Sequence, residues 1–343
     1  MHKRVLIVTP VLDDWTSFAL LVRGIADAFV AADCCFSILA VDDGSSVPFD
    51  PASIRLPEAS CVDDISILRL AANLGHQRAI AVGLSHIAKR EDIDAVVVMD
   101  SDGEDRPDDI AALRAASDSH PDKVVLARRV ARSETRVFRT GYVLYKFLFR
   151  VFSGQSISFG NFSLLPMPAV RRLVYMSELW NNLAAAVMRS RLRYTTVPVK
   201  RGNRYAGISK MNVPSLIVHG LSAMSVHTDI IFVRILLAAT LLAALSVLGM
   251  FVVVLIRVFT QFGVPGWAST MFGDLVIVLV QTLVMIMATS LLVLAGRSQR
   301  PIVPVVDSPI FVMLETRLDA GRHRGPGRSA IDLWPKEDQP VHG

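Results

Sequence analysis

Short apolar runs recur about every thirty residues over the first part of the chain, and this spacing limits the folds that the sequence can adopt. The runs are VLIV from Val5, SILAV from Ser37, ISILRL from Ile65, AVVVM from Ala95 and KVVLA from Lys123. Helical patterns lie between them, for example over residues 17–32 and 76–90. Continuous apolar strands that alternate with helices are typical of a parallel sheet covered on both faces. The sequence therefore predicts a doubly wound α/β domain with a mainly parallel sheet.

Polar clusters follow each of the first four predicted strands. They are TPVLDD from Thr9, DDGSS from Asp42, NLGHQ from Asn73 and DSDGED from Asp100. Sheets of this kind bind ligands beyond the carboxyl ends of their strands, so we expect the four clusters to converge on one site. Each cluster alone is also ordinary turn chemistry, but four in succession favour a site.

Two long apolar segments follow in the second half of the chain. They predict transmembrane spans at about residues 230–256 and 275–296, because each is long enough to cross a bilayer. The 343 residues are 52% hydrophobic, with a mean hydropathy of +0.44, which favours a soluble domain joined to a membrane portion. A buried hairpin in a soluble core is the alternative.

Basic residues gather on one side of the predicted spans. Those before the first span are Arg193, Lys200, Arg201, Arg204 and Lys210, and those after the second are Arg297, Arg300, Arg317, Arg322, Arg324 and Arg328. The positive-inside rule therefore predicts a multi-pass protein of the inner membrane with both termini in the cytoplasm. Three cysteines offer no paired disulfide framework, which agrees with a reducing compartment.

Further segments are predicted to contact the membrane or the solvent. Residues 136–152 and 213–228 mix basic or polar residues with apolar ones and predict interfacial helices, although 136–152 also fits an amphipathic core helix. The tail from about Asp319 is rich in Gly, Pro and charge and predicts disorder. The net charge of +5 lies beside the spans, so it favours anionic lipid headgroups over nucleic acid as a partner.

Asp100 and Asp102 directly follow an apolar strand. Alternate residues of an extended segment point the same way, so these two carboxylates can bind one hard cation, with Glu104 as a third ligand. Mg²⁺ or Mn²⁺ would leave positions for the phosphates of a substrate. The alternative is a solvated loop before a helix, which explains Asp108 and Asp109 but not two acids at a strand end.

The order of five segments resembles one enzyme family. The segments are TPVLDD, VDDGS from Val41, NLGHQRAIAVGL, DSDGEDRPDD and RYAGISKMN from Arg204. With the hairpin that follows, they resemble family-2 glycosyltransferases of the polyprenyl-phosphate type, such as dolichyl-phosphate mannose synthases and the bacterial enzymes that make undecaprenyl-phosphate glucose or aminoarabinose. The resemblance covers about residues 4–212 and implies a nucleotide-sugar-binding domain of the GT-A type.

The resemblance assigns residues to the donor side of a site. It implies that Asp42 and Asp43 hold the nucleoside of a UDP- or GDP-sugar, and that Pro10 and Gly75 shape this pocket. The acids of DSDGED match a D-x-D-x-Q metal-binding pattern in which Asp100, Asp102 and Glu104 are the ligands, with Glu in place of Gln.

The resemblance also assigns cations to the phosphates. Arg129 and Arg139 fall where relatives place arginines near the acceptor phosphate. Arg204 and Lys210 match the basic loop R-x-x-G-x-S-K, which closes over the phosphates in the family.

Asn161 departs from the family pattern. Relatives carry an Asp here as a candidate general base, whereas this chain has FGNFSLL from Phe159. Loss of a base would slow transfer to an alcohol by about 10²- to 10⁴-fold. A phosphate monoester is largely ionised at pH 7 and needs positioning instead of deprotonation. We therefore place Asp102 and Asn161 at the reacting centre and favour a lipid-phosphate acceptor, while an altered or reduced activity stays open.

The predicted organisation has four parts. They are a cytoplasmic GT-A domain at 1–212, an interfacial helix at 213–228, a transmembrane hairpin at 229–297, and a cytoplasmic segment and tail at 298–343. Relatives with this hairpin assemble as tetramers, so the resemblance implies a homo-oligomer. The segment from Pro301 has alternating β-type residues and predicts either a strand that pairs between subunits or a linker.

The predicted activity is inverting, metal-dependent transfer of one sugar from a nucleotide to polyprenyl (undecaprenyl) phosphate at the cytoplasmic membrane face. Two alternatives stay open. A processive polysaccharide synthase would share the fold, but its Gln-x-x-Arg-Trp signature does not occur in the sequence. A catalytically weak membrane scaffold would explain Asn161 and Glu104, although the intact DSD and GISK strings argue against it.

Overall fold

The computed structural model describes residues 3–29, 34–54, 60–129, 159–206, 224–226, 228–260 and 265–318. The chain divides into two compact units. One consists of residues 1–133, 157–212 and 302–343, and the other of residues 134–156 and 213–301. Predictions for residues 136–152, for most of 213–228 and for the tail from Asp319 lie outside the described residues.

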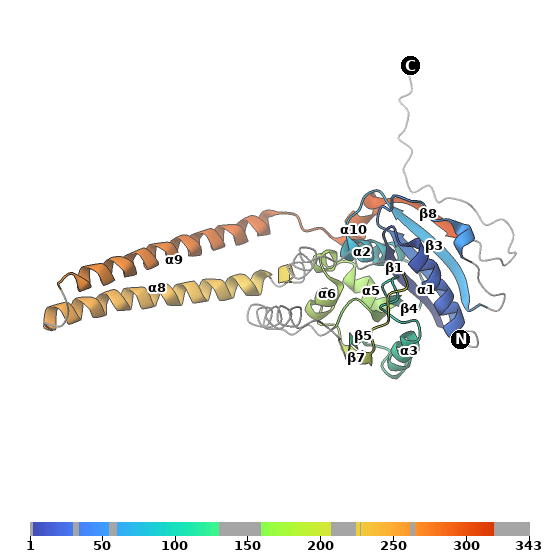
Figure 1. Cartoon of the computed structure of the whole chain (residues 1–343), viewed down its shortest axis with the longest axis horizontal. Coiled ribbons are helices and arrows are strands. Elements are labelled where there is room, and N and C mark those ends of the chain that lie inside the picture. The colour runs from blue at the N-terminus through green and yellow to red at the C-terminus, as the bar shows by residue number, and fades with distance from the viewer. Residues whose placement is uncertain are drawn as a thin grey trace, which may run out of the picture. The chain divides into compact units, whose positions relative to one another are not determined.

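An eight-stranded sheet forms the centre of the first unit (Figure 1), in the order β7-β5-β6-β4-β1-β2-β3-β8. The strands are β1 (Lys3–Val11), β2 (Cys34–Asp42), β3 (Val62–Leu70), β4 (Ala95–Val98), β5 (Val124–Arg129), β6 (Ser163–Pro166), β7 (Tyr194–Val199) and β8 (Val312–Leu318). Strand β6 runs antiparallel to both of its neighbours and β8 runs antiparallel to β3, while the other pairs are parallel. The mainly parallel sheet predicted from the sequence is therefore confirmed.

Helices cover both faces of this sheet. They are α1 (Trp15–Ala28), α2 (His76–Ile87), α3 (Asp109–Ser119), α5 (Met167–Leu173), α6 (Leu183–Arg189) and α10 (Pro304–Asp307), with short 3-10 turns η1 (Pro51–Ser53), η2 (Ser177–Trp180) and η3 (Ser308–Phe311). Successive strand residues face opposite sides. Leu6 and Val8 of β1 accordingly pack in the core with α2, α5 and α6, whereas Val5 and Ile7 pack with α1 and α3.

The C-terminal strand β8 returns to the sheet of its own chain. It pairs with β3, and the backbone N–H of Ala71 donates to the carbonyl of Phe311 over 2.8 Å. His86 of α2 pairs with Glu315 of β8 at 3.1 Å. Most of the segment from Pro301, predicted as a strand between subunits or a linker, instead forms α10 and η3, and a strand begins only at Val312 and pairs with β3 of the same chain.

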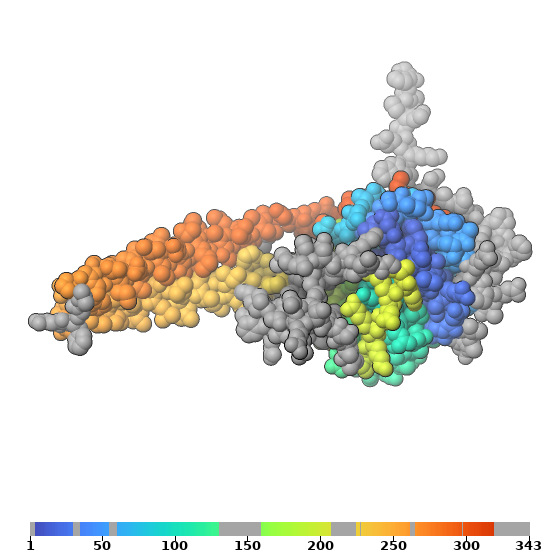
Figure 2. Space-filling model, in the orientation of Figure 1, coloured from blue at the N-terminus to red at the C-terminus, as the bar shows by residue number. Residues whose placement is uncertain are grey.

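The second unit contains two long apolar helices, α8 (Thr228–Phe259) and α9 (Trp267–Ser298), which pack against each other (Figure 2). Gly249 of α8 permits close approach, since a Cβ at that position would lie 3.2 Å from Leu275 Cδ1. In the most apolar window of each helix, only 11% and 6% of the residues are buried within the described chain. Both are long and apolar enough to cross a bilayer.

Helix α9 begins inside the segment predicted to connect the two spans. Gly266 precedes it with a left-handed φ of 94°, and the hydroxyls of Ser269 and Thr270 donate to the Gly266 carbonyl over 2.8 and 3.1 Å. The first backbone hydrogen bond of the helix runs from the Thr270 N–H to the same carbonyl over 3.1 Å, so the helix begins at Trp267, before the strongly apolar sequence.

Candidate active site

The loops after β1 and β2 are bound to each other. Asp13 has a φ of 50°, and its Oδ1 accepts hydrogen bonds from the backbone N–H and the hydroxyl of Ser46 over 2.7 and 2.8 Å. The Asp13 N–H in turn donates to the hydroxyl of Ser45 over 2.9 Å. The loop after β4 joins them, because the Ser101 hydroxyl donates to the carbonyl of Pro10 over 3.4 Å. The predicted convergence of strand-end clusters is therefore present.

Asp43 ties the loop after β2 to the loop after β3. Its two carboxylate oxygens accept the backbone N–H groups of Leu74 and Gly75 over 2.7 and 2.9 Å. Desolvation raises the pKa of Asp43 even though these two hydrogen bonds oppose the rise. Asp42 accepts the N–H of Ser45 over 2.8 Å and lies 3.7 Å from Arg69 Nε. Both acids are almost fully buried and hold the loops in place; contact with a nucleoside stays a prediction.

Strand β4 ends at Val98, so Asp100 lies in an irregular segment just beyond it, and Asp102, Glu104 and Asp105 lie in the turns and bends that follow. The Asp102 Oδ1 accepts the N–H of Glu104 over 3.0 Å, and the Asp105 Oδ2 accepts the N–H of Asp100 over 3.0 Å. Desolvation raises the pKa of Asp102. Burial and the nearby charge of Asp100 raise the pKa of Asp105 to about 7. Four carboxyl groups are thus crowded into one short segment.

Arginines compensate this negative charge. Arg129 Nη2 donates to Asp105 Oδ1 over 3.0 Å, and Arg129 Nη1 lies 3.7 Å from Glu104. Arg201 also pairs with Glu104, and Arg204 Nη2 lies 3.4 Å from Asp102 Oδ2. Arginine therefore already contacts Glu104, which the sequence suggested as the third metal ligand.

The segment that carries Arg201 and Arg204 is docked on the acidic turn. The backbone N–H of Gly202 donates to the carbonyl of Glu104 and that of Tyr205 donates to the carbonyl of Asp102, each over 2.8 Å. Gly103 allows this approach, because its φ is 89° and a Cβ there would lie 2.8 Å from the Tyr205 ring. The start of the predicted basic loop is thus held beside the acids.

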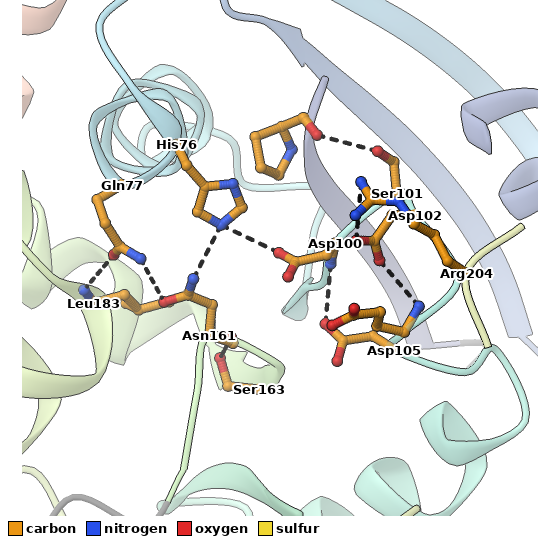
Figure 3. Close-up of polar contacts among 12 residues, drawn as sticks. His76, Gln77, Asp100, Ser101, Asp102, Asp105, Asn161, Ser163, Leu183 and Arg204 are labelled. Atoms are coloured by element: carbon orange, nitrogen blue, oxygen red, sulfur yellow. Dashed lines mark hydrogen bonds and ion pairs between the residues drawn. The ribbon is translucent and has the colours of Figure 1, made fainter. Parts of the chain in front are cut away.

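A chain of amide side chains leads from α6 to the acids (Figure 3). The N–H of Leu183 donates to Gln77 Oε1 over 3.1 Å, and Gln77 Nε2 donates to Asn161 Oδ1 over 3.1 Å. Asn161 Nδ2 lies 3.1 Å from Nε2 of His76, which is also 3.2 Å from Asp100 Oδ1. Loss of hydration is the largest single influence and works against protonation of His76, but the charge and hydrogen bond of Asp100 together with the charges of Asp102 and Asp105 outweigh it and raise the pKa of His76.

The structure thus brings most of the predicted site residues to one sheet edge. Their described members are Pro10, Asp42, Asp43, Gly75, Asp100, Asp102, Glu104, Arg129, Asn161 and Arg204. Arg139 and Lys210 lie outside the described residues. Sequence reasoning did not assign His76, Gln77, Asp105 or Arg201, although the first two follow a predicted strand end and Asp105 lies within DSDGED.

Asp100 and Asp102 fit a divalent cation in their donor chemistry. They offer hard carboxylate oxygens, and their side chains are 27% and 17% exposed, although Oδ1 of Asp100 is itself buried. Across the part of the chain that the structure describes, no three acidic, histidine or cysteine side chains already converge as a metal site. A cation at these two acids would therefore need further ligands from substrate or water.

Comparison with known proteins identifies the domain type. Residues 7–166 match the profile of Glycosyl transferase family 2. The chain is 24% identical over 240 residues to the uncharacterized glycosyltransferase YkcC of Bacillus subtilis (strain 168), covering 68% of this chain and 71% of that protein. It is 25% identical over 219 residues to the undecaprenyl-phosphate 4-deoxy-4-formamido-L-arabinose transferase of Salmonella choleraesuis (strain SC-B67), covering 63% of this chain and 64% of that protein.

Among solved structures, the chain is similar to glucosyl-3-phosphoglycerate synthase from Mycobacterium tuberculosis, crystallised with Mn²⁺, UDP-glucose and phosphoglyceric acid. The TM-score is 0.48 and the identity is 12%, and the match covers 67% of this chain and 80% of the synthase.

Proposed function

Residues 7–166 form a glycosyl transferase family 2 domain, so the chain is a glycosyltransferase, and on this premise we propose that it transfers a single sugar from a nucleotide sugar to polyprenyl phosphate at a membrane surface. The observation that carries the proposal is the joining of the strand-end loops to an acidic turn and a cluster of arginines. The two exposed apolar helices and the name of the Salmonella relative support a lipid acceptor.

The donor would lie along the interlocked loops. Pro10, Asp42, Asp43 and Gly75 frame the region expected to hold the nucleoside, and ligands of parallel sheets bind at this edge. The diphosphate would face the acidic turn. Arg204 is 3.4 Å from Asp102 and can exchange that carboxylate for a phosphate oxygen as the donor enters.

Asp100 and Asp102 would hold Mg²⁺ or Mn²⁺. Such an ion, when bound, neutralises negative charge that develops on the departing diphosphate. Glu104 already pairs with Arg129 and Arg201, so its predicted part in metal binding requires these contacts to be exchanged. The arginines then become available to phosphate groups, for which their planar guanidinium groups are well suited.

The reaction is a displacement at the anomeric carbon. A phosphate oxygen of the acceptor forms the new bond, the bond from the anomeric carbon to the diphosphate breaks, and the nucleoside diphosphate leaves. Attack opposite to the leaving group inverts the configuration. The acceptor arrives ionised, so the site needs groups that orient it and no group that removes its proton.

The helices α8 and α9 would form a membrane hairpin with both flanking segments in the cytoplasm. This topology rests on the basic residues beside the helices, and it places the domain where nucleotide sugars are available. A homo-oligomer remains part of the proposal through the family resemblance alone.

The experiment supplies the full-length protein in lipid vesicles with radiolabelled UDP- and GDP-sugars, with and without undecaprenyl phosphate. We expect label in an organic-extractable lipid that carries one sugar, and only when the lipid phosphate is present. A ladder of longer products would favour the processive synthase. If no donor gives labelled lipid, and thermal unfolding shows that the protein is folded, the result would favour the scaffold.

A further inference from the structure

Gln77 has a side-chain orientation that its surroundings fix. It lies in the first turn of α2 and is only 9% exposed. Its Oε1 accepts the backbone N–H of Leu183, the first residue of α6, over 3.1 Å. A backbone N–H can only donate, so the oxygen of Gln77 must face α6. The NH₂ group of Gln77 must therefore point the other way.

The hydrogen bond from Gln77 fixes the orientation of the Asn161 side-chain amide. The NH₂ group of Gln77 can only donate, so the atom of Asn161 that faces it at 3.1 Å is the carbonyl oxygen Oδ1. The NH₂ group of Asn161 then points to the side of His76 and Asp100 (Figure 3). A backbone donor in α6 thus determines, through two amides, that residue 161 presents N–H donors to the candidate active site.

This polarity is opposite to that of a general base. A carboxylate at position 161 would present only acceptors and could take a proton from a hydroxyl. An amide whose NH₂ group faces the site does not repel the charge or the lone pairs of an oxyanion. Its N–H groups can instead donate hydrogen bonds to that oxyanion. His76, which lies between Asn161 and Asp100, adds a second polar group on the same side.

We propose that Gln77 is a positioning residue that holds Asn161 as a hydrogen-bond donor toward an acceptor that enters as an oxyanion of the phosphate monoester class. The inference rests on the proposed sugar transfer and specifies the acceptor chemistry of the same site. Gln77 acts through Asn161, and the residue that contacts the acceptor is Asn161.

The variant Gln77→Glu tests this orientation with almost no change in shape. One oxygen of the introduced carboxylate still accepts the Leu183 N–H, but the other is an acceptor where Gln77 had a donor. Asn161 must then turn its NH₂ group toward residue 77 and present its oxygen to the site. Asn161→Leu tests the same donor polarity by removing the amide. Ser163→Ala is the matched control, since the Ser163 hydroxyl anchors the backbone carbonyl of Asn161 over 2.8 Å without orienting its amide.

Steady-state kinetics would use the full-length variants in vesicles with undecaprenyl phosphate. We expect Gln77→Glu and Asn161→Leu to raise the KM for this acceptor by about 10- to 100-fold, because each loses a hydrogen bond to a charged group. The KM for the nucleotide sugar should change less than about threefold, as should both constants for Ser163→Ala. Unchanged acceptor KM in both polarity variants, or equal effects on donor and acceptor, would overturn the inference.

A panel of acceptors separates this inference from the proposed function. The panel contains undecaprenyl phosphate, undecaprenol and glycerol 3-phosphate. Use of glycerol 3-phosphate alone, with the same response to Gln77→Glu, would support the oxyanion preference and remove the lipid acceptor. Use of undecaprenol in preference to either phosphate would overturn the inference while leaving transfer to a lipid intact.

Discussion

The carboxylate of Asp43 accepts the backbone N–H of Gly75 over 2.9 Å, and this contact joins the loop after β2 to the residue that precedes helix α2. The second oxygen of Asp43 accepts the N–H of Leu74 over 2.7 Å. Gly75 has a φ of 91°, so the chain turns sharply here before His76 and Gln77 enter the site. The two hydrogen bonds to the buried Asp43 carboxylate therefore fix the start of α2, and with it the positions from which the His76 and Gln77 side chains extend.

The variant Asp43→Asn should lose one of these two hydrogen bonds, because an amide nitrogen would face a backbone N–H. We expect a loss of about 1–3 kcal/mol in stability and a higher KM for the nucleotide sugar. Thermal unfolding of the full-length protein in detergent measures the first effect and donor kinetics the second. Asp27→Asn, on the exposed surface of α1, is the control and should leave both unchanged.

Gly44 should not tolerate a side chain. Its φ is 79°, and a Cβ would lie 2.9 Å from the backbone nitrogen of Asn73. We expect Gly44→Ala to lower the melting temperature and to weaken donor binding, since the loops after β2 and β3 would be forced apart. Gly160→Ala is the comparison, because a Cβ at Gly160 meets nothing within 4 Å. Equal melting temperatures for the two variants would show that the close approach is unimportant.

Arg129 should stabilise the acidic turn as well as serve the reaction. Its guanidinium donates to Asp105 over 3.0 Å, and Asp105 is only 3% exposed. We expect Arg129→Met to destabilise the fold by about 1–3 kcal/mol, because the buried acid loses its partner. The neighbouring exposed Arg128, changed to Met, provides the control. If Arg129→Met abolishes transfer but unfolds like the wild type, the residue acts on substrate alone.

The pairing of β8 with the rest of the domain should weaken in acid. The hydrogen bond from His86 lowers the pKa of Glu315, which is 27% exposed. A carboxyl group whose folded pKa is lowered contributes stability above its unfolded pKa and loses that contribution as the pH falls through the folded value. We therefore expect faster hydrogen exchange at β8 as the pH falls below about 4.5, after correction for intrinsic rates.

Glu315→Gln should remove this pH dependence at β8. Exchange at β4, which is remote from Glu315 in the strand order, serves as the internal reference. An acid response of β8 that persists unchanged in Glu315→Gln would assign it to another group.

The sequence predicted the elements whose signal is local. Strands β1 to β5 are continuous apolar runs, and α8 and α9 are long apolar segments, so periodicity and length were sufficient. Strands β6 and β7 were not predicted, because the SLLP of β6 and the mixed YTTVPV of β7 give no continuous apolar run. The partner of β8 also depends on tertiary pairing that no local pattern specifies.

Within the site, the sequence indicated which loops converge but not how the side chains pair. Asp100 and Asp102 were expected on one extended strand segment, whereas both lie beyond the end of β4, Asp100 with its N–H bound to Asp105 and Asp102 in a turn where its carboxylate accepts the N–H of Glu104. The contact between Gln77 and Asn161 joins residues 84 positions apart, so spacing alone could not reveal it. Family resemblance supplied the roles of single residues, and the geometry added the contacts that hold them.

We propose that the carboxylates beyond β4 support metal-dependent sugar transfer to a lipid phosphate. The most direct measurement is the initial rate of label transfer from the nucleotide sugar to undecaprenyl phosphate in vesicles, for the wild type and for Asp102→Asn. We predict that chelation stops transfer by the wild type, that Mn²⁺ or Mg²⁺ restores it, and that Asp102→Asn stays inactive with either metal. Transfer at the wild-type rate in the presence of chelator, or by Asp102→Asn, would contradict the account.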